Sequence, residues 1–231
     1  MDCRDCINTR CPINNTCLPE WLQYTQNHKS SIYASVGQSI FNEGELVRGI
    51  YIICSGKAKV LIEDDNGKGR IIRVAGSGQV LGHRGFSETM VYPISAKTLI
   101  ESEIAYISNE DFFKLIRSNN DLSIYMMMFF ADELMNSEKN LRISTTLTSR
   151  EKVAYALARL IKANGFINEE ARQIDLGLNF KELSNFAGIS YTTLTRVLKS
   201  FLQEGILKKS NGNFYLVDES VLSQLSWMEI Q

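Results

Sequence analysis

The sequence predicts an α+β protein in which an N-terminal β-roll (a jelly roll) precedes a long helix and a small helical domain that ends in a β-hairpin. Three observations carry this prediction. Ten of the fifteen glycines lie between positions 37 and 85, among short β-prone runs. Residues 121–141 contain neither glycine nor proline. Beyond position 147, apolar residues recur at helical spacing until an Asn-Gly turn appears near the end of the chain.

Composition and charge favour a folded two-domain protein and argue against several other classes of protein. The chain has 231 residues, 44% of them hydrophobic, which is typical of a folded protein with two domains. A net charge of −1 argues against a protein that coats nucleic acid or membranes through bulk charge. The sequence contains no apolar run of the roughly 20 residues that a membrane span needs, and it does not begin with a signal-peptide pattern. We expect a cytoplasmic protein with reduced cysteines.

Four of the five cysteines fall in the first segment, residues 1–22. Cys3, Cys6, Cys11 and Cys17 follow the spacing Cys-x2-Cys-x4-Cys-x5-Cys, and we expect them to hold a metal. Four soft thiolates suit a 4Fe–4S cluster, and they equally suit a tetrahedral zinc ion. Disulfide switching, or no metal at all, is the third alternative. Cys54 lies on a predicted strand and is expected to be a small core residue.

The β-roll is expected over residues 23–118. Residues 51–54, 60–62, 71–74 and 104–107 are short β-prone runs, and turn residues separate them. The run 64–67 reads Asp-Asp-Asn-Gly, which predicts a hairpin turn because Asn-Gly tolerates positive φ.

Residues 119–146 are expected to form one long dimerisation helix. Apolar residues recur there at helical spacing, namely Leu122, Tyr125, Met126, Phe129, Phe130, Leu134 and Leu141. Met127 and Met128 widen this stripe beyond what packing on one domain requires. A helix that is apolar on two faces usually buries the second face on a partner, so we expect a homodimer. A wholly buried core helix is the alternative.

The C-terminal domain, residues 147–231, is predicted to be a winged helix-turn-helix. Thr148 and Glu151 form a capping box that begins one helix, and Asn179 and Glu182 suit the start of another. Gly188 allows a tight turn, after which residues 191–203 form the next helix. An Asn-Gly hairpin then follows at 206–217.

We expect the exposed face of helix 191–203 and the flank of the hairpin to contact DNA. Leu194, Val197, Leu198 and Phe201 must face the core, so short polar groups and Arg196 occupy the opposite face. The candidate DNA-contacting residues are Ser190, Tyr191, Thr192, Thr193, Thr195, Arg196, Lys199, Lys208 and Lys209. Residues 180–213 carry five basic side chains against two acidic ones, so positive charge is concentrated where phosphates would lie. A solvated surface helix is the alternative for each residue alone.

Two stretches resemble the family of the cyclic-AMP receptor protein and the fumarate–nitrate reduction regulator, the CRP/FNR family. Residues 37–57 are similar to its β-roll signature, and residues 188–196 are similar to its recognition-helix motif. The resemblance implies a cyclic-nucleotide-binding-like β-roll, a homodimer and a palindromic site on double-stranded DNA. It also implies RNA polymerase as a protein partner.

The sequence departs from that family in three places. Thr192 stands where a base-reading Glu is common, so we expect a different half-site. Nucleotide-binding members carry Gly-Glu-Leu and Arg-Ser where this chain has Gly82-His83-Arg84 and Ile94-Ser95, so cyclic-AMP sensing is not expected. The effector-pocket candidates are Gly82, His83, Arg84 and Ser95, and Arg84 suits another anion. Ala105 stands in place of a β-roll cluster cysteine, while Cys11 adds an N-terminal thiol.

The leading hypothesis is a dimeric, sequence-specific DNA-binding transcription regulator that senses oxygen or redox state through an N-terminal iron–sulfur cluster. A second hypothesis keeps DNA binding but places a small molecule in the β-roll, with a structural zinc or metal-free cysteine segment. A third is a metal-carrying electron-transfer or protein-interaction module. No triad, paired acidic site or phosphate loop is visible, so we expect no enzyme.

Overall fold

A computed structural model describes residues 2–63 and 69–229, and the turn expected at 64–67 lies outside them. The chain divides into two compact units, Met1–Ser137 and Glu138–Gln231. The boundary falls inside α4 (Asn120–Thr146), so one helix contributes residues to both units. Among the helices described, none combines the length and the apolar character needed to cross a membrane.

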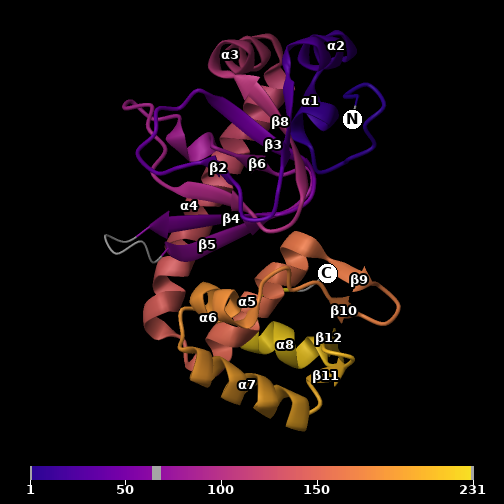
Figure 1. The fold of residues 1–231 in the computed structure, drawn as a ribbon, viewed down its shortest axis with the longest axis vertical. Coiled ribbons are helices and arrows are strands. Elements are labelled where there is room, and N and C mark those ends of the chain that lie inside the picture. Colours follow the sequence, from indigo (N-terminus) through magenta and orange to yellow (C-terminus); the bar gives the residue numbers. More distant parts are fainter. Residues whose placement is uncertain (1, 64–68, 230–231) are drawn as a thin grey trace. The chain divides into compact units, whose positions relative to one another are not determined.

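Two four-stranded antiparallel sheets form the β-roll of the first unit (Figure 1). The first sheet has the order β1 (Ser30–Ala34), β8 (Ser102–Ser108), β3 (Gly49–Ser55) and β6 (Val80–Leu81). The second has the order β2 (Ser39–Phe41), β7 (Ser95–Thr98), β4 (Ala58–Glu63) and β5 (Gly69–Ala75). The four strand runs expected from the sequence lie in β3, β4, β5 and β8, and the predicted β-roll is confirmed.

The central strand β3 of the first sheet is buried on both of its faces. Tyr51 and Ile53 of β3 point into the core cluster that also contains residues of the second sheet, such as Val60. Ile50 and Ile52 point the other way, because successive strand residues alternate between faces. They join a second cluster on the outer face of the sheet. This outer cluster is the platform on which the N-terminal segment and the helices pack.

Helices cover that outer face. They are α1 (Pro12–Thr16), α3 (Asn109–Ser118) and the first part of α4, and they contribute Ile13, Leu115, Leu122 and Met126 to the outer cluster. Between α1 and β1 lies α2 (Pro19–His28). The hydroxyl of Tyr24 in α2 donates to Asp111 Oδ1 in α3 over 2.7 Å. Helices α1, α2 and α3 were not predicted from the sequence, and α2 crosses the predicted boundary after residue 22.

The second unit contains the helix-turn-helix. Its helices after α4 are α5 (Ser149–Asn164), α6 (Phe180–Ala187), α7 (Tyr191–Gln203) and α8 (Glu219–Ser226). Both capping boxes expected from the sequence, at Thr148 and at Asn179, are confirmed. Its sheet has the order β11 (Leu207–Ser210), β12 (Asn213–Leu216), β10 (Gln173–Ile174) and β9 (Phe166–Asn168). Strands β9 and β10 are too short to leave a periodic signal in the sequence.

Candidate functional site

Gly188 sets the turn between α6 and α7. It lies in the left-handed region at φ +67°, where a residue without a Cβ avoids strain. The amide of Ile189 then donates to the carbonyl of Ser184 over 3.0 Å, which closes the end of α6. Ser190 begins the next helix, because its Oγ accepts from the backbone amide of Thr193 over 3.1 Å. These local bonds fix where α7 starts.

The two faces of α7 divide as the sequence predicted. Leu194, Val197, Leu198 and Phe201 are buried. Four side chains on the opposite face are exposed, namely Tyr191, Thr192, Arg196 and Lys199. In the described part of the chain, no ion pair involves Arg196 or Lys199. Their charge is therefore directed to solvent.

Three of the candidate DNA-contacting hydroxyl groups at α7 already form hydrogen bonds within the protein. The Oγ atoms of Ser190 and Thr193 share a hydrogen bond of 2.8 Å. The hydroxyl of Thr195 donates to the carbonyl of Thr192 over 3.0 Å. These groups hold the first turn of α7, whereas Tyr191 and Arg196 extend from it.

An acidic residue at the end of α7 is neutralised by Arg150 of α5. The guanidinium of Arg150 pairs with the carboxylate of Glu204, and its Nη1 donates to Ser200 Oγ over 2.9 Å. This hydrogen-bonded pairing lowers the pKa of Glu204 to about 2. Arg150 also stacks over the ring of Phe201 at 4.8 Å, so it ties α5 to α7.

The hairpin of β11 and β12 forms the wing. Asn211 and Gly212 both have positive φ, at 49° and 82°, as a two-residue hairpin turn requires, so the predicted Asn-Gly turn is confirmed. Lys208 is exposed on β11. The ammonium of Lys209 lies 5.5 Å from the ring centroid of Phe214. The wing therefore presents two cations beside the helix-turn-helix.

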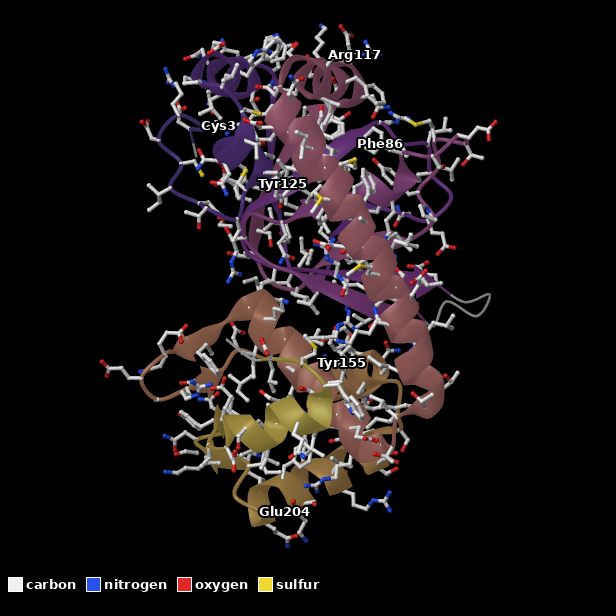
Figure 2. The ribbon with its side chains drawn as sticks, turned by 180° about the vertical axis from the view of Figure 1, so that it is seen from behind. Cys3, Phe86, Arg117, Tyr125, Tyr155 and Glu204 are labelled. Atoms are coloured by element: carbon white, nitrogen blue, oxygen red, sulfur yellow. The ribbon has the colours of Figure 1, made fainter. Side chains whose placement is uncertain are left out.

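The N-terminal segment and the outer face of the first sheet enclose a cavity of about 40 Å³. Cys3, Cys6 and Cys11 line it, and so does Cys54 of β3. Cys3 is labelled in Figure 2, on the segment that precedes α1. Cys17 does not line the cavity, although it packs against the same outer cluster as Cys11 and Cys54. The structure thus brings together three of the four predicted thiols and Cys54, which was expected to be a small core residue.

Burial keeps two of these thiols protonated. Desolvation raises the pKa of Cys11 to about 11 and that of Cys17 to about 12. Among the described residues, no three His, Cys, Asp or Glu side chains are arranged as a metal-ligating group. The donors have the chemistry that a soft metal or an iron–sulfur cluster needs, and ligation would deprotonate them and draw them together. The donor set therefore fits such a group.

The four effector-pocket candidates lie in the β-roll, although not all at one cavity. Gly82, His83 and Arg84 line a cavity of about 10 Å³, and the last two belong to the short 3-10 helix η1 (His83–Gly85). Ser95 lies elsewhere, and its Oγ accepts from the amide of Glu43 over 2.9 Å. A cavity of this size holds roughly one water molecule.

Glu133 of α4 is an anion that faces three basic residues lining this pocket. Its Oε2 accepts from Arg84 Nη2 over 2.8 Å and lies 3.4 Å from His83 Nε2. Its Oε1 lies 4.0 Å from Arg73 Nη1. Burial alone would raise the pKa of Glu133, but the His83 and Arg84 hydrogen bonds and the Arg73 charge outweigh it and lower the pKa. Arg84 was expected from the sequence to suit an anion, and Glu133 is a partner that the sequence pattern did not indicate.

Comparison with known proteins agrees with this geometry. The model of the cyclic nucleotide-binding domain matches residues 32–119, and the model of the Crp-like helix-turn-helix domain matches residues 149–225. The chain belongs to the CRP/FNR family. It is therefore a DNA-binding transcription regulator, and its C-terminal unit contains the family's helix-turn-helix.

Relatives within the CRP/FNR family differ in what their names say they sense. The cyclic AMP receptor protein of Thermus thermophilus is 25% identical over 83% of this chain and 85% of its own length. The anaerobic regulatory protein of Pasteurella multocida is 24% identical over 98% of this chain and 83% of its own length. The structure of FixK2 from Bradyrhizobium japonicum shares the fold, with a TM-score of 0.76, 18% identity, and coverage of 85% of this chain and 96% of that one.

Replacing Arg196 tests whether α7 reads bases. We expect Arg196→Ala to weaken binding to the preferred DNA site by about 1–3 kcal/mol, because a bidentate contact to guanine would be lost. Titrations against the preferred site and random DNA at fixed salt measure the difference. Lys162→Ala on α5 is a matched control for removing one positive charge. An equal loss on both DNAs would reassign Arg196 to a phosphate contact.

Acid should lower the stability of the folded protein through His83 and Glu133. Burial lowers the pKa of His83 below its ordinary value of 6.5, and the pKa of Glu133 is also lowered. Both groups bind fewer protons in the folded than in the unfolded chain. The free energy of unfolding should therefore fall as the pH drops below about 6.5, and fall further below about 4.5.

Urea unfolding at pH 7.5, 6.0 and 5.0 measures this dependence. His83→Gln should remove much of the decrease between pH 6.5 and 5.0, whereas His28→Gln, at an exposed position, should leave it in place. A decrease of the same size in His83→Gln as in the wild type would contradict the assignment.

Proposed function

We propose that this regulator binds palindromic DNA as a homodimer and senses oxygen or redox state through an iron–sulfur cluster bound by cysteines of its N-terminal segment. The observation that carries the proposal is the position of two N-terminal thiols. Cys11 and Cys17 pack on the outer cluster of the first sheet, which also contains Leu122 and Met126 of α4. The sensing segment and the proposed dimer helix thus share one hydrophobic cluster.

A change at the thiols is expected to alter the packing of α4. Cys11 and Cys17 contact the outer cluster, and so do Tyr125 and Phe129 of α4. Tyr125 is labelled in Figure 2, on the long helix of the first unit. When bound, an iron–sulfur cluster supplies a redox-active metal centre. The thiols then contribute charged ligands instead of protonated apolar groups, which changes what α4 packs against.

The free face of α4 supports a dimer. Ile124, Met127, Met128, Leu134 and Met135 are all exposed, with Met127 at 62% and Met135 at 63%. Met128 lies four residues after Ile124, and Met135 lies one heptad after Met128, so all three fit the a and d positions of a coiled-coil seam. Contiguous apolar surface of this kind is typical of an interface. A second copy of the helix has the matching pattern, and we therefore propose α4 as the dimer contact.

The alternative of a small-molecule effector has weaker support. The candidate pocket is nearly filled, and its cations already face Glu133. Family membership favours DNA binding over the electron-transfer or protein-interaction alternative. RNA polymerase stays the expected protein partner of the DNA-bound regulator.

Anaerobic purification tests the sensor. We expect a coloured protein with about four iron and four sulfide per chain, which loses both on exposure to air. Its affinity for the DNA site should fall by about 5–150-fold at the same time, the usual range of coupling between two sites. A variant with Ser at Cys3, Cys6, Cys11 and Cys17 is the control, and air should not change its affinity. A colourless protein that holds zinc and ignores air would contradict the proposal.

A charge on the free face of α4 tests the dimer. Met128→Glu should raise the dimer dissociation constant by at least about 30-fold, because a carboxylate would be buried in an apolar contact. Sedimentation velocity over a range of protein concentrations measures the change. Val36→Glu is the matched control, since Val36 is an exposed apolar residue of the β-roll at 66% exposure. A wild-type chain that sediments as a monomer would refute the dimer contact.

A further inference from the structure

We propose that Glu133 acts as a built-in anionic effector: from α4 it binds the basic side chains that line the β-roll pocket, and it fixes the helix there without a free ligand. Both partners of this contact belong to the first unit, and none of them is a cysteine. The contact is therefore separate from the metal centre. A free anion could bind these basic side chains only by displacing Glu133.

Glu133 continues the face of α4 that packs on the β-roll. Leu122 and Met126 belong to the outer cluster of the first sheet, and Phe129 packs against it. Glu133 follows Met126 by seven residues and Phe129 by four, so these side chains lie on one side of the helix. The side chain of Glu133 is only 15% exposed. A carboxylate therefore stands where the pattern of this face predicts an apolar residue.

Both oxygens of the carboxylate face basic groups of the β-roll. Arg84 donates to Oε2 from Nε over 3.2 Å and from Nη2 over 2.8 Å. His83 Nε2 lies 3.4 Å from the same oxygen, and Arg73 Nη1 lies 4.0 Å from Oε1. The Nη2 of Arg84 also donates to Ser137 Oγ, one turn further along α4, over 3.4 Å. Two consecutive turns of α4 are thereby tied to β5 and η1.

The basic residues are held in place by the β-roll itself. Arg73 Nη1 donates to the carbonyl of Val80 over 3.2 Å, and its Nη2 donates to Gln79 Oε1 over 3.3 Å. Gly82 has φ +83° and makes the tight turn that leads from β6 into η1. The cationic site is therefore a feature of the β-roll, and α4 supplies the anion that it binds.

The charges of the site favour a bound anion. The side chain of Arg73 is 17% exposed, so water screens its charge little. Among the described residues, Glu133 is the one carboxylate that forms an ion pair with Arg73 or Arg84. Two guanidinium groups thus share one anion. Without it they would be left unpaired and close enough to repel each other.

The site can be reached from solvent on one side. The side chain of Arg84 is 30% exposed, so a small anion can approach it once the carboxylate of Glu133 is removed. Truncating Glu133 to alanine removes one methylene group and the carboxylate, which together match acetate in size and charge. Acetate is therefore the probe that fits the vacated space.

An ion pair in this place fixes the position of α4. Replacing a buried ion pair by apolar residues is often neutral or stabilising, and the best-attested use of such groups is to set register. A rotation of α4 by one residue would turn the carboxylate by about 100° about the helix axis and take it away from Arg84. Glu133 therefore sets the direction in which the free face of α4 points relative to the β-roll.

Truncation and rescue by a free anion test the proposal. In Glu133→Ala, the amide hydrogens of residues 129–137 should exchange at least about tenfold faster than in the wild type, because the buried guanidinium groups lose their partner. Affinity for the DNA site should fall by about 5–150-fold, the usual range of coupling between two sites. Replacing sodium chloride by sodium acetate at constant ionic strength should reverse most of both losses.

Three controls separate this role from a purely structural one. Glu133→Gln keeps the size of the side chain but not its charge, so it should show losses in the same direction and no response to acetate. Asp132→Ala removes the neighbouring, exposed carboxylate of the same helix and should match the wild type in either salt. The wild type gives the general effect of acetate on DNA binding, which is subtracted.

Rescue of Glu133→Ala by acetate, without rescue of Glu133→Gln, supports the proposal. Losses in Glu133→Ala that acetate leaves unchanged would reduce Glu133 to a structural contact and overturn it. Exchange and affinity at the wild-type level in Glu133→Gln would overturn it too, and this variant decides the case in which Glu133→Ala does not fold.

Metal analysis of the same samples keeps this proposal apart from the sensor. Iron, sulfide and zinc are measured in every variant. A loss of DNA affinity that follows a loss of metal, with exchange in α4 unchanged, would overturn the role of Glu133 and leave metal sensing standing. A wild type without an iron–sulfur cluster refutes the sensor, and the response of Glu133→Ala to acetate then still decides the role of Glu133.

Discussion

The apolar outer face of the first sheet is the constraint on which the sensor unit depends. Ile50, Ile52, Ala105 and Ile107 all point away from the β-roll core, so water has to be excluded from a second side of the sheet. The N-terminal segment, α3 and α4 supply that cover. Cys11, Cys17 and Cys54 pack against the same cluster as the helix whose free face we propose as the dimer contact.

Much of the fold was predictable because its signals are local. The caps at Thr148 and Asn179, the turn at Gly188 and the hairpin at Asn211 each follow from side-chain chemistry within a few residues. The bounds of α7 followed from this chemistry too. Short elements such as α1, β9 and β10 were missed, because they contain too few residues for a periodic pattern and depend on tertiary contacts.

The sites were only partly predictable, because their contacts join distant parts of the sequence. Glu133 lies about fifty residues from its partners Arg84 and His83, and no spacing rule connects them. Cys54 looked like a core residue because its neighbours on β3 are apolar, and only the docking of the segment shows that it reaches the thiol cavity. The candidate DNA-binding surface was easier to predict than these two sites, since most of its residues lie on one helix.

The amide of Asn8 donates to Ser77 Oγ over 2.8 Å, and the hydroxyl of Ser77 donates to the carbonyl of Cys54 over 2.6 Å. These groups are uncharged, so the two bonds do not depend on a titration near neutral pH. They restrict the segment before any ligand arrives, and less conformational entropy is lost when a ligand binds. A segment held in this way has less far to move when its thiols draw together around a ligand. In the metal centre that we propose, a segment already held by these bonds would not have to fold again each time the metal is lost and regained.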